Sequence, residues 1–290
     1  MNTINLDVPQ GVGDIFWVYQ KFSPYFDKIN FNICQLAHHD PVISQRSLKW
    51  VKLFPKTGEV LYKNIPEQEY CDLIGGIFQQ KDILKTARPD ISFKYSCNKH
   101  LENGVRIEKI DEELLIEKTV ELQINSAPLK FKEGSYICVY VSGGEKAWHR
   151  NQINGWGYSN WISFIKKIYN KYNFNFPIIF VGASYDREAI ESVQKALIDY
   201  KIECCFYCDS YPANVLYIIK NSKLFVGYQS GLSILADNMD VKQIMMYFPV
   251  IKNMMYAWPK KENIDNKIYN CATFDQTPNE VVANLPDKIL

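Results

Sequence analysis

The segment Leu224–Asp237, Leu-Phe-Val-Gly-Tyr-Gln-Ser-Gly-Leu-Ser-Ile-Leu-Ala-Asp, decides how this chain folds. Its first three residues form an apolar run that is too short for a helix and typical of a buried strand. Gly227 to Gly231 is expected to form a tight turn, and 232–238 has the apolar spacing of a helix. This order leaves backbone N–H groups free at the helix N-terminus, where phosphate binds. Every βα unit needs such a turn, so this motif alone favours a plain structural role.

The segments around this motif alternate between apolar strands and helices. We expect strands at 136–141, 176–181, 202–207 and 242–248, and helices at 158–172, 186–200, 212–221, 232–238 and 278–285. Such alternation with nearly continuous apolar strands predicts a parallel sheet with helices on both faces. The first of these strands ends in a second glycine turn, Val141-Ser142-Gly143-Gly144, which is followed by Lys146.

The N-terminal half begins with a strand, a loop, a helix and a strand. They are expected at 4–8, 9–14, 15–22 and 28–34, and the loop carries two glycines, Gly11 and Gly13. Asp14 stands where a carboxylate can cap the helix, and this structural role is an alternative to any catalytic one. Residues 35–134 are less regular, with strands expected at 59–62, 70–77 and 91–95, helices at 78–86 and 111–122, and a linker at 125–134.

These elements predict an α/β protein with two Rossmann-like domains facing across a cleft. The expected domains are residues 1–134 on the acceptor side and residues 135–270 on the nucleotide side. A helix in 271–290 is expected to pack back toward the N-terminal domain. Ligands of open parallel sheets bind at the carboxyl ends of the strands. The glycine turns at 11–13, 142–144 and 227–231 fall at such ends, so facing domains would line one cleft with them.

The composition excludes several classes of protein. The chain has 33 Lys plus Arg against 32 Asp plus Glu, which argues against a sequence-independent nucleic-acid binder. The N-terminus does not resemble a signal peptide, and no apolar stretch reaches transmembrane length. Three of the eight cysteines cluster at 204–208 in an expected strand, and no second C-x-x-C pairs with this cluster, so we expect free thiols in a reducing cytoplasm and no metal. The abundance of Lys, Asn, Ile and Tyr suggests an AT-rich bacterial or viral genome, which places the protein in a bacterial cytoplasm or an infected host cell.

Three motifs in this order resemble those of the ADP-heptose:lipopolysaccharide heptosyltransferases and their relatives, glycosyltransferase family 9, which have the GT-B fold. The first is Gly11-Val12-Gly13-Asp14-Ile15. The second is 141–148, Val-Ser-Gly-Gly-Glu-Lys-Ala-Trp, and the third is 226–233, Val-Gly-Tyr-Gln-Ser-Gly-Leu-Ser. The resemblance is best over 136–250 and the first twenty residues.

The resemblance implies an inverting, metal-independent glycosyltransferase that uses a nucleotide-diphosphate sugar and no other cofactor. It gives Asp14 the role of catalytic base, which accepts the proton of an acceptor hydroxyl. The residues that it places around the donor are Gly13, Ser142, Gly143, Gly144, Lys146, Gly182, Asp186, Tyr228, Gln229, Ser230 and Gly231. Among them Asp186 would lie near the ribose. A lysine and helix N-termini aimed at the leaving diphosphate would stabilise its developing charge.

Two positions depart from the family pattern. Gln229 replaces the usual Asp of the third motif, and Ile234 replaces its later His. Both positions belong to the donor side, so the identity of the donor sugar stays open. The acceptor is either a surface glycan or a hydroxymethylated DNA base of a phage. Two other functions remain as alternatives: a GT-B-like protein that binds a nucleotide sugar or glycan without transfer, and a nucleotide-sugar epimerase. Without the three motifs, Lys146 would be interpreted as a charged loop residue in solvent, and Trp148 and Trp161 as packing residues.

Overall fold

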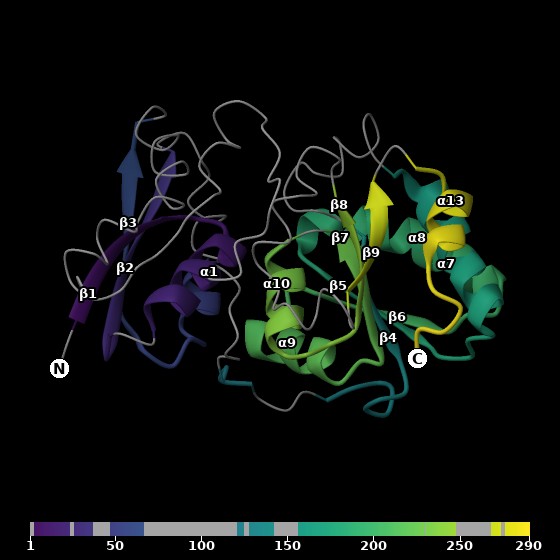
Figure 1. Ribbon diagram of the computed structural model, residues 1–290, viewed down its shortest axis with the longest axis horizontal. Helices are drawn as coiled ribbons and strands as arrows, with labels where there is room; N and C mark the ends of the chain where they lie inside the picture. The colour runs from purple at the N-terminus through teal and green to yellow at the C-terminus, as the bar shows by residue number, and fades with distance from the viewer. Residues whose placement is uncertain are drawn as a thin grey trace. The chain divides into compact units, whose positions relative to one another are not determined.

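The computed structural model describes residues 3–23, 26–36, 47–66, 121–124, 128–141, 156–228, 230–247, 268–273 and 276–290. The chain divides into two compact units (Figure 1). Unit 1 contains Met1–Ile124 and Asn253–Lys261, and unit 2 contains Asn125–Lys252 and Glu262–Leu290. The strands expected at 70–77 and 91–95 and the helix expected at 78–86 lie outside the described residues. So does the helix expected at 111–122 up to residue 120, and residues 121–124 are not helical.

Unit 1 is built on a three-stranded parallel sheet in the order β1-β2-β3. Its elements are β1 (Thr3–Pro9), α1 (Val12–Phe22), β2 (Lys28–Leu36) and β3 (Thr57–Ile65). Apolar and polar residues alternate along β1 and β2, so Leu6 and Phe31 are buried while Asn5 is exposed. The strands expected at 4–8, 28–34 and 59–62 are confirmed.

Unit 2 is built on a six-stranded parallel sheet in the order β6-β5-β4-β7-β8-β9. Its strands are β4 (Ile137–Tyr140), β5 (Ile178–Gly182), β6 (Cys204–Cys208), β7 (Leu224–Tyr228), β8 (Gln243–Tyr247) and β9 (Ile268–Thr273). The chain starts in the middle at β4, moves outward to β6, and then returns to pair β7 with β4. The strand order thus reverses between β4 and β7, which is the doubly wound arrangement of dinucleotide-binding sheets.

Helices cover both faces of this sheet, as predicted. In Figure 1, α9 (Pro212–Lys220) and α10 (Gly231–Asn238) lie on one face. The other face carries α7 (Tyr158–Tyr172), α8 (Arg187–Asp199) and α13 (Pro278–Asn284), and α8 follows a short 3-10 turn, η2 (Ser184–Asp186). Consecutive residues of β4 and β7 are buried, as expected for strands covered on both faces, and Val226 and Ile244 join the core cluster with residues of α7 and α8. No helix in the described part of the chain is long and apolar enough to cross a membrane.

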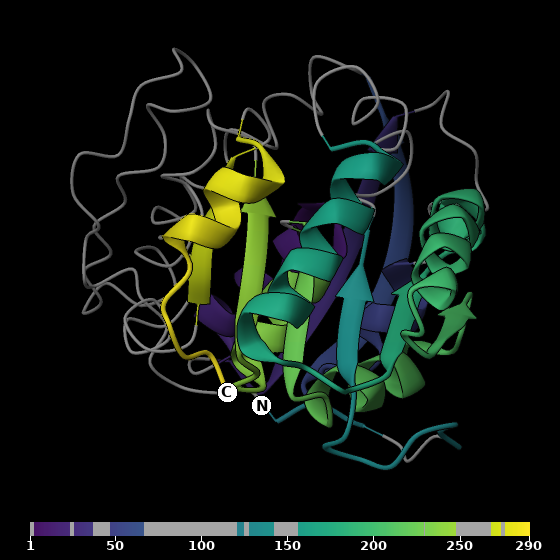
Figure 2. The ribbon, with the colours of Figure 1, turned by 90° about the vertical axis from the view of Figure 1, so that its right-hand side faces the viewer.

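The C-terminal helix packs on α7 of its own unit, and the two helices lie side by side in Figure 2. Val281 and Leu285 belong to the core cluster of unit 2, and Lys171 Nζ donates to the Val282 and Leu285 carbonyls. The apolar side chains of this helix complete the core over α7. The expectation that the helix packs back toward the N-terminal domain stays a prediction.

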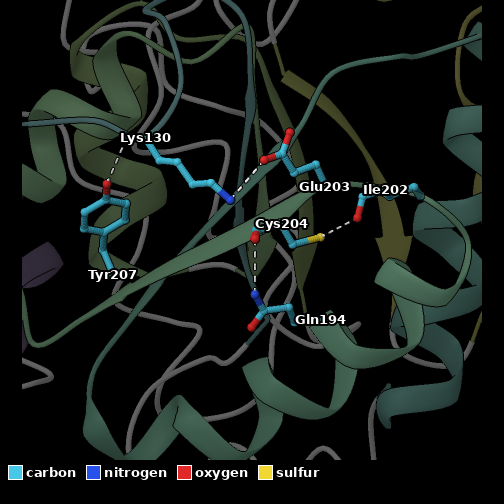
Figure 3. A network of polar contacts seen from close by, with 6 residues as sticks. All are labelled: Lys130, Gln194, Ile202, Glu203, Cys204 and Tyr207. Atoms are coloured by element: carbon cyan, nitrogen blue, oxygen red, sulfur yellow. Dashed lines mark hydrogen bonds and ion pairs between the residues drawn. The ribbon is translucent and has the colours of Figure 1, made fainter.

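The segment 128–135 leads into β4 along the edge strand β6. Lys130 Nζ forms an ion pair with Glu203 Oε1 at 3.0 Å, and the Lys130 amide donates to the Tyr207 hydroxyl at 3.3 Å (Figure 3). Tyr207 in turn donates to the Pro128 carbonyl. These contacts attach the described part of the expected linker to unit 2, and the two units divide between Ile124 and Asn125 rather than at residue 134.

Two turns are shorter than the sequence predicts. Helix α1 begins at Val12 and β7 extends to Tyr228. Gly13 and Asp14 therefore lie in the first helical turn, and Gly227 lies in the strand. Strand β9 had no counterpart among the predicted elements, and it pairs with β8 at the edge of the sheet.

Candidate functional site

The carboxyl ends of β4 and β7 lie side by side where the strand order reverses. Tyr140 of β4 pairs with Gly227 of β7. A Cβ atom at Gly227 would lie 2.9 Å from the Tyr140 carbonyl oxygen, so glycine allows the two strands to approach this closely. Ligands of open parallel sheets bind at such a reversal. The candidate site is therefore formed by the segments that follow these two strands.

Helix α10 begins at this edge. Its N-cap residue is Ser230, which has extended backbone angles and whose amide donates to Ser233 Oγ at 2.9 Å. The amides of Ser233 and Ile234 bond to the Ser230 carbonyl, whereas the amides of Gly231 and Leu232 precede the first intrahelical bond. The first turn contains no acidic residue. The partial positive charge of this helix start is thus available to an anion.

Ser230 also brings a hydroxyl to the helix start. Its Oγ is buried and has no hydrogen-bond partner among the described residues. Buried hydroxyls are normally hydrogen-bonded, so an unpaired one marks a position that a ligand or a water can satisfy. Two amides and one hydroxyl at a helix N-terminus can together hold one phosphate group.

Tyr228 lies in the core behind this turn. Trp161 Nε1 donates to the Tyr228 hydroxyl at 3.0 Å, and that hydroxyl donates to the Trp156 carbonyl at 3.2 Å. Burial raises the pKa of Tyr228 well above its ordinary value, so the hydroxyl stays protonated and can donate. The side chain is only 2% exposed. It packs in the core together with Trp161, which is also buried and has the packing role considered from the sequence. The donor contact expected of Tyr228 stays a prediction.

Gly182 and Asp186 form a second compact turn at the end of β5. Asp186 is completely buried, and its Oδ2 accepts a hydrogen bond from the Ala183 amide at 2.8 Å. A Cβ atom at Gly182 would lie 2.9 Å from that same oxygen. The Asp186 carboxylate thus orders the turn. The donor contact expected of Asp186 stays a prediction.

The other predicted site residues divide into two groups. Gly13 is the buried second residue of α1, and Asp14 is the next residue of this helix. Ser142, Gly143, Gly144, Lys146 and Gln229 lie outside the described residues. The structure brings together Tyr228, Ser230 and Gly231 on β7 and α10, next to the end of β4.

Sequence reasoning missed the role of Ser233. Its hydroxyl accepts from the Ser230 amide and donates to the Ser230 carbonyl at 2.7 Å, so it fixes the first turn of α10. The signal was the spacing of Ser230 and Ser233, which matches the three-residue spacing of a capping box. Ile234, at the position of the family histidine, is buried in α10 and cannot serve as a polar donor contact.

The cysteines of unit 2 are structural. Cys138 and Cys204 are buried, and Cys205 and Cys208 are half-buried in β6. Burial raises the pKa of Cys205 and Cys208 to about 11, so both are neutral thiols near pH 7. No group of three or more His, Cys, Asp or Glu residues with the geometry of a metal site occurs among the described residues.

No model of a known protein family matches the chain, and no curated protein matches it in sequence. Solved structures do match. ADP-heptose lipopolysaccharide heptosyltransferase II of E. coli aligns with a TM-score of 0.55 and 13% identity, over 98% of this chain and 97% of its own. A glycosyltransferase family 9 protein of Veillonella parvula aligns with a TM-score of 0.53 and 10% identity, over 94% and 86% of the two chains. E. coli heptosyltransferase WaaC with ADP aligns with a TM-score of 0.51 and 10% identity, over 96% and 98%.

At these identities the similarity establishes the fold. The α/β, GT-B-like class predicted from the sequence is confirmed, and the chain shares the fold of the heptosyltransferases and of a family 9 glycosyltransferase.

Proposed function

We propose that this protein is a glycosyltransferase that moves a sugar from a nucleotide-diphosphate sugar to an acceptor hydroxyl. The observation that carries the proposal is the start of α10. The Gly231 and Leu232 amides and the buried Ser230 hydroxyl meet at the reversal point of the sheet, without an acidic residue in the first turn. The shared fold supports it, since one of the similar structures is a heptosyltransferase with ADP.

The departing diphosphate gains negative charge as the bond to the sugar breaks. In the proposed reaction, the α10 N-terminus stabilises this charge with its fixed dipoles. Lys146 and the Ser142–Gly144 turn would bind the same group, since they follow β4, the neighbour of β7. In this proposal the lysine, amides and hydroxyls stabilise the diphosphate without a metal.

Asp14 is the proposed general base. Its carboxylate would accept the acceptor proton while the hydroxyl oxygen attacks the anomeric carbon in line with the departing diphosphate, which inverts that carbon. Removal of such a base typically costs about 10²- to 10⁴-fold in rate. The acceptor is a hydroxyl of a surface glycan or of a hydroxymethylated DNA base, and the near-balanced charge of 33 basic against 32 acidic residues favours the glycan.

A thermal-shift screen with UDP-, GDP-, ADP- and CMP-sugars tests donor binding. A bound ligand stabilises the folded state by about 2.7 kcal/mol at a concentration of 100 times its Kd. We expect at least one diphosphate sugar to raise Tm, and CMP-sugars, which have only one phosphate, to raise it less. Absence of a shift with every diphosphate sugar would contradict the proposal.

Asp14→Ala distinguishes a transferase from a protein that only binds. The replacement of the family Asp by Gln229 and of its His by Ile234 is what motivates the binding-only alternative. We expect the variant to keep the thermal shift of the selected donor and to lose donor hydrolysis or transfer. If the wild type binds the donor without ever releasing its nucleoside diphosphate, the binding-only function is correct.

A further inference from the structure

Tyr228 is placed to control the geometry of the α10 N-terminus. It is the last residue of β7, and only one residue separates it from Ser230, the N-cap of α10. Its Cα is paired with Met246 of β8, so its backbone is held in the sheet. Any change in the direction in which the chain leaves β7 therefore moves the Ser230 hydroxyl and the first amides of α10.

The Tyr228 hydroxyl joins β7 to the segment at the start of α7 in the core. It accepts from Trp161 on α7 at 3.0 Å and donates to the carbonyl of Trp156 at 3.2 Å. Both indole rings are less than 2% exposed. The ring of Trp161 stands edge-on to the rings of Tyr228 and Trp156, with centroid distances of 5.1 and 5.5 Å. The hydroxyl is thus surrounded by rigid aromatic packing and has a fixed orientation.

Trp156 lies two residues before α7 and carries the carbonyl that accepts this hydrogen bond. Trp156 is itself anchored, because its Nε1 donates to the Gln276 carbonyl at 2.9 Å. The Tyr228 hydroxyl therefore ties the segment at the start of α7 to the point where the chain leaves β7.

We infer that Tyr228 is a positioning residue for the diphosphate of the donor, acting through its hydrogen bond to the Trp156 carbonyl. The inference rests on the proposed function and gives a different role to a residue that the family resemblance had placed in direct contact with the donor. Phenylalanine would keep the ring and its packing, but it would leave the Trp156 carbonyl and the Trp161 N–H unpaired in the core. The fold would persist while the α10 start loses its fixed geometry.

Tyr136→Phe provides a matched control. The Tyr136 hydroxyl donates to the Ile218 carbonyl at 2.7 Å and its side chain is completely buried, so the substitution removes the same kind of hydrogen bond. Tyr136 precedes β4 and therefore lies at the opposite, amino edge of the same sheet. Both variants are expected to lower Tm, and only Tyr228→Phe is expected to affect the site.

The experiment is calorimetric titration of wild type, Tyr228→Phe and Tyr136→Phe with UDP, GDP and ADP, together with amide hydrogen exchange of residues 224–238 in the free proteins. We expect Tyr228→Phe to raise the Kd of the bound nucleoside diphosphate about tenfold, equivalent to about 1.4 kcal/mol, and Tyr136→Phe to change it less than about twofold. Amide exchange in 224–238 should become faster in Tyr228→Phe alone.

An unchanged Kd in Tyr228→Phe, or equal weakening in both variants, would overturn the inference. If the wild type binds none of the three diphosphates, the proposed function fails, and exchange in 224–238 then decides the positioning role separately. Faster exchange in Tyr228→Phe alone would support that role, and equal exchange in the two variants would contradict it.

Discussion

Two glycines at the carboxyl edge of the six-stranded sheet lie so close to a neighbouring group that a side chain would not fit without movement. Gly227 faces the Tyr140 carbonyl, and Gly182 faces the Asp186 carboxylate. The two neighbouring groups differ in how easily they can shift. Asp186 Oδ2 is at the end of a side chain, whereas the Tyr140 carbonyl belongs to a strand that is hydrogen-bonded on both sides. We therefore expect Gly227 to be the less tolerant of the two positions.

Gly227→Ala should destabilise the protein by about 1–3 kcal/mol, because its Cβ would force β4 and β7 apart. Urea denaturation measures this change. Gly157→Ala is the control, since no atom lies within 4 Å of a Cβ at that position and its φ of −72° suits alanine. Its free energy of unfolding should stay within about 0.5 kcal/mol of wild type. Equal stability of the two variants would show that the strands have room for a side chain.

The thiols of β6 should react as neutral groups in the folded protein. Burial raises the pKa of Cys205 and Cys208 to about 11 and that of Cys204 to about 12, from an ordinary value of 9.0. Only the thiolate is alkylated. Alkylation by iodoacetamide should thus be slow at pH 8 and rise toward pH 11, whereas the unfolded chain should already react near pH 9. The stability that these neutral thiols contribute is complete below pH 9 and is lost as the pH rises toward 11.

Mass spectrometry of the tryptic peptide 202–220, which contains all three cysteines, measures this reaction. Rapid labelling of the native protein at pH 8 would contradict the burial of β6.

At the scale of elements, helix α13 is stabilised mainly by its contact with α7. Leu285 is 3% exposed and lies in the core cluster of unit 2. Leu285→Ala should lower the free energy of unfolding by about 2–5 kcal/mol, as large-to-small core substitutions do. Asn284→Ala, at the exposed neighbouring position, should change it by less than about 0.5 kcal/mol. Two equal, small effects would mean that α13 is not part of the core.

The sequence predicts most elements of unit 2 because their patterns are local. The helix over 158–172 is found at Tyr158–Tyr172, since its apolar spacing and its flanking Gly157 and Asn173 define both ends. Strand β9 was missed because its Tyr-Asn-Cys run has no continuous apolar stretch, and its place depends on pairing with β8. Pairing of this kind is tertiary and leaves little signal in the strand itself.

The candidate site was predicted less completely than the fold. The glycine turn after β7 correctly indicated a helix N-terminus, because Gly and Ser favour turns and helix N-caps through their own local conformation and hydrogen bonding. Asp186 and Tyr228 were assigned to the donor from motif position, and the motif did not indicate that both side chains are buried. Burial depends on what packs over a residue, and a position in a motif does not contain that information.

At the scale of the whole molecule, the proposed function depends on the order of the strands in unit 2. Unit 2 has the doubly wound order with its reversal between β4 and β7, and the alternation of strands and helices in the sequence was sufficient to predict this class. The likeness to heptosyltransferase structures extends over nearly the whole chain at 13% identity, and at this identity it establishes the fold alone.

The most direct test of the account is the effect of a negative charge at the start of α10. Aspartate in the first turn of a helix favours the helix dipole, so Gly231→Asp should leave Tm nearly unchanged while its carboxylate repels a bound diphosphate. Asn279→Asp makes the same change of charge in the first turn of α13, at an exposed position outside the site.

Calorimetric titration of wild type and both variants with the nucleoside diphosphate selected by the thermal-shift screen is the decisive measurement. We predict that Gly231→Asp raises the Kd at least about tenfold, which corresponds to about 1.4 kcal/mol, and that Asn279→Asp binds like the wild type. Undiminished binding by a folded Gly231→Asp variant would contradict a diphosphate site at the N-terminus of α10.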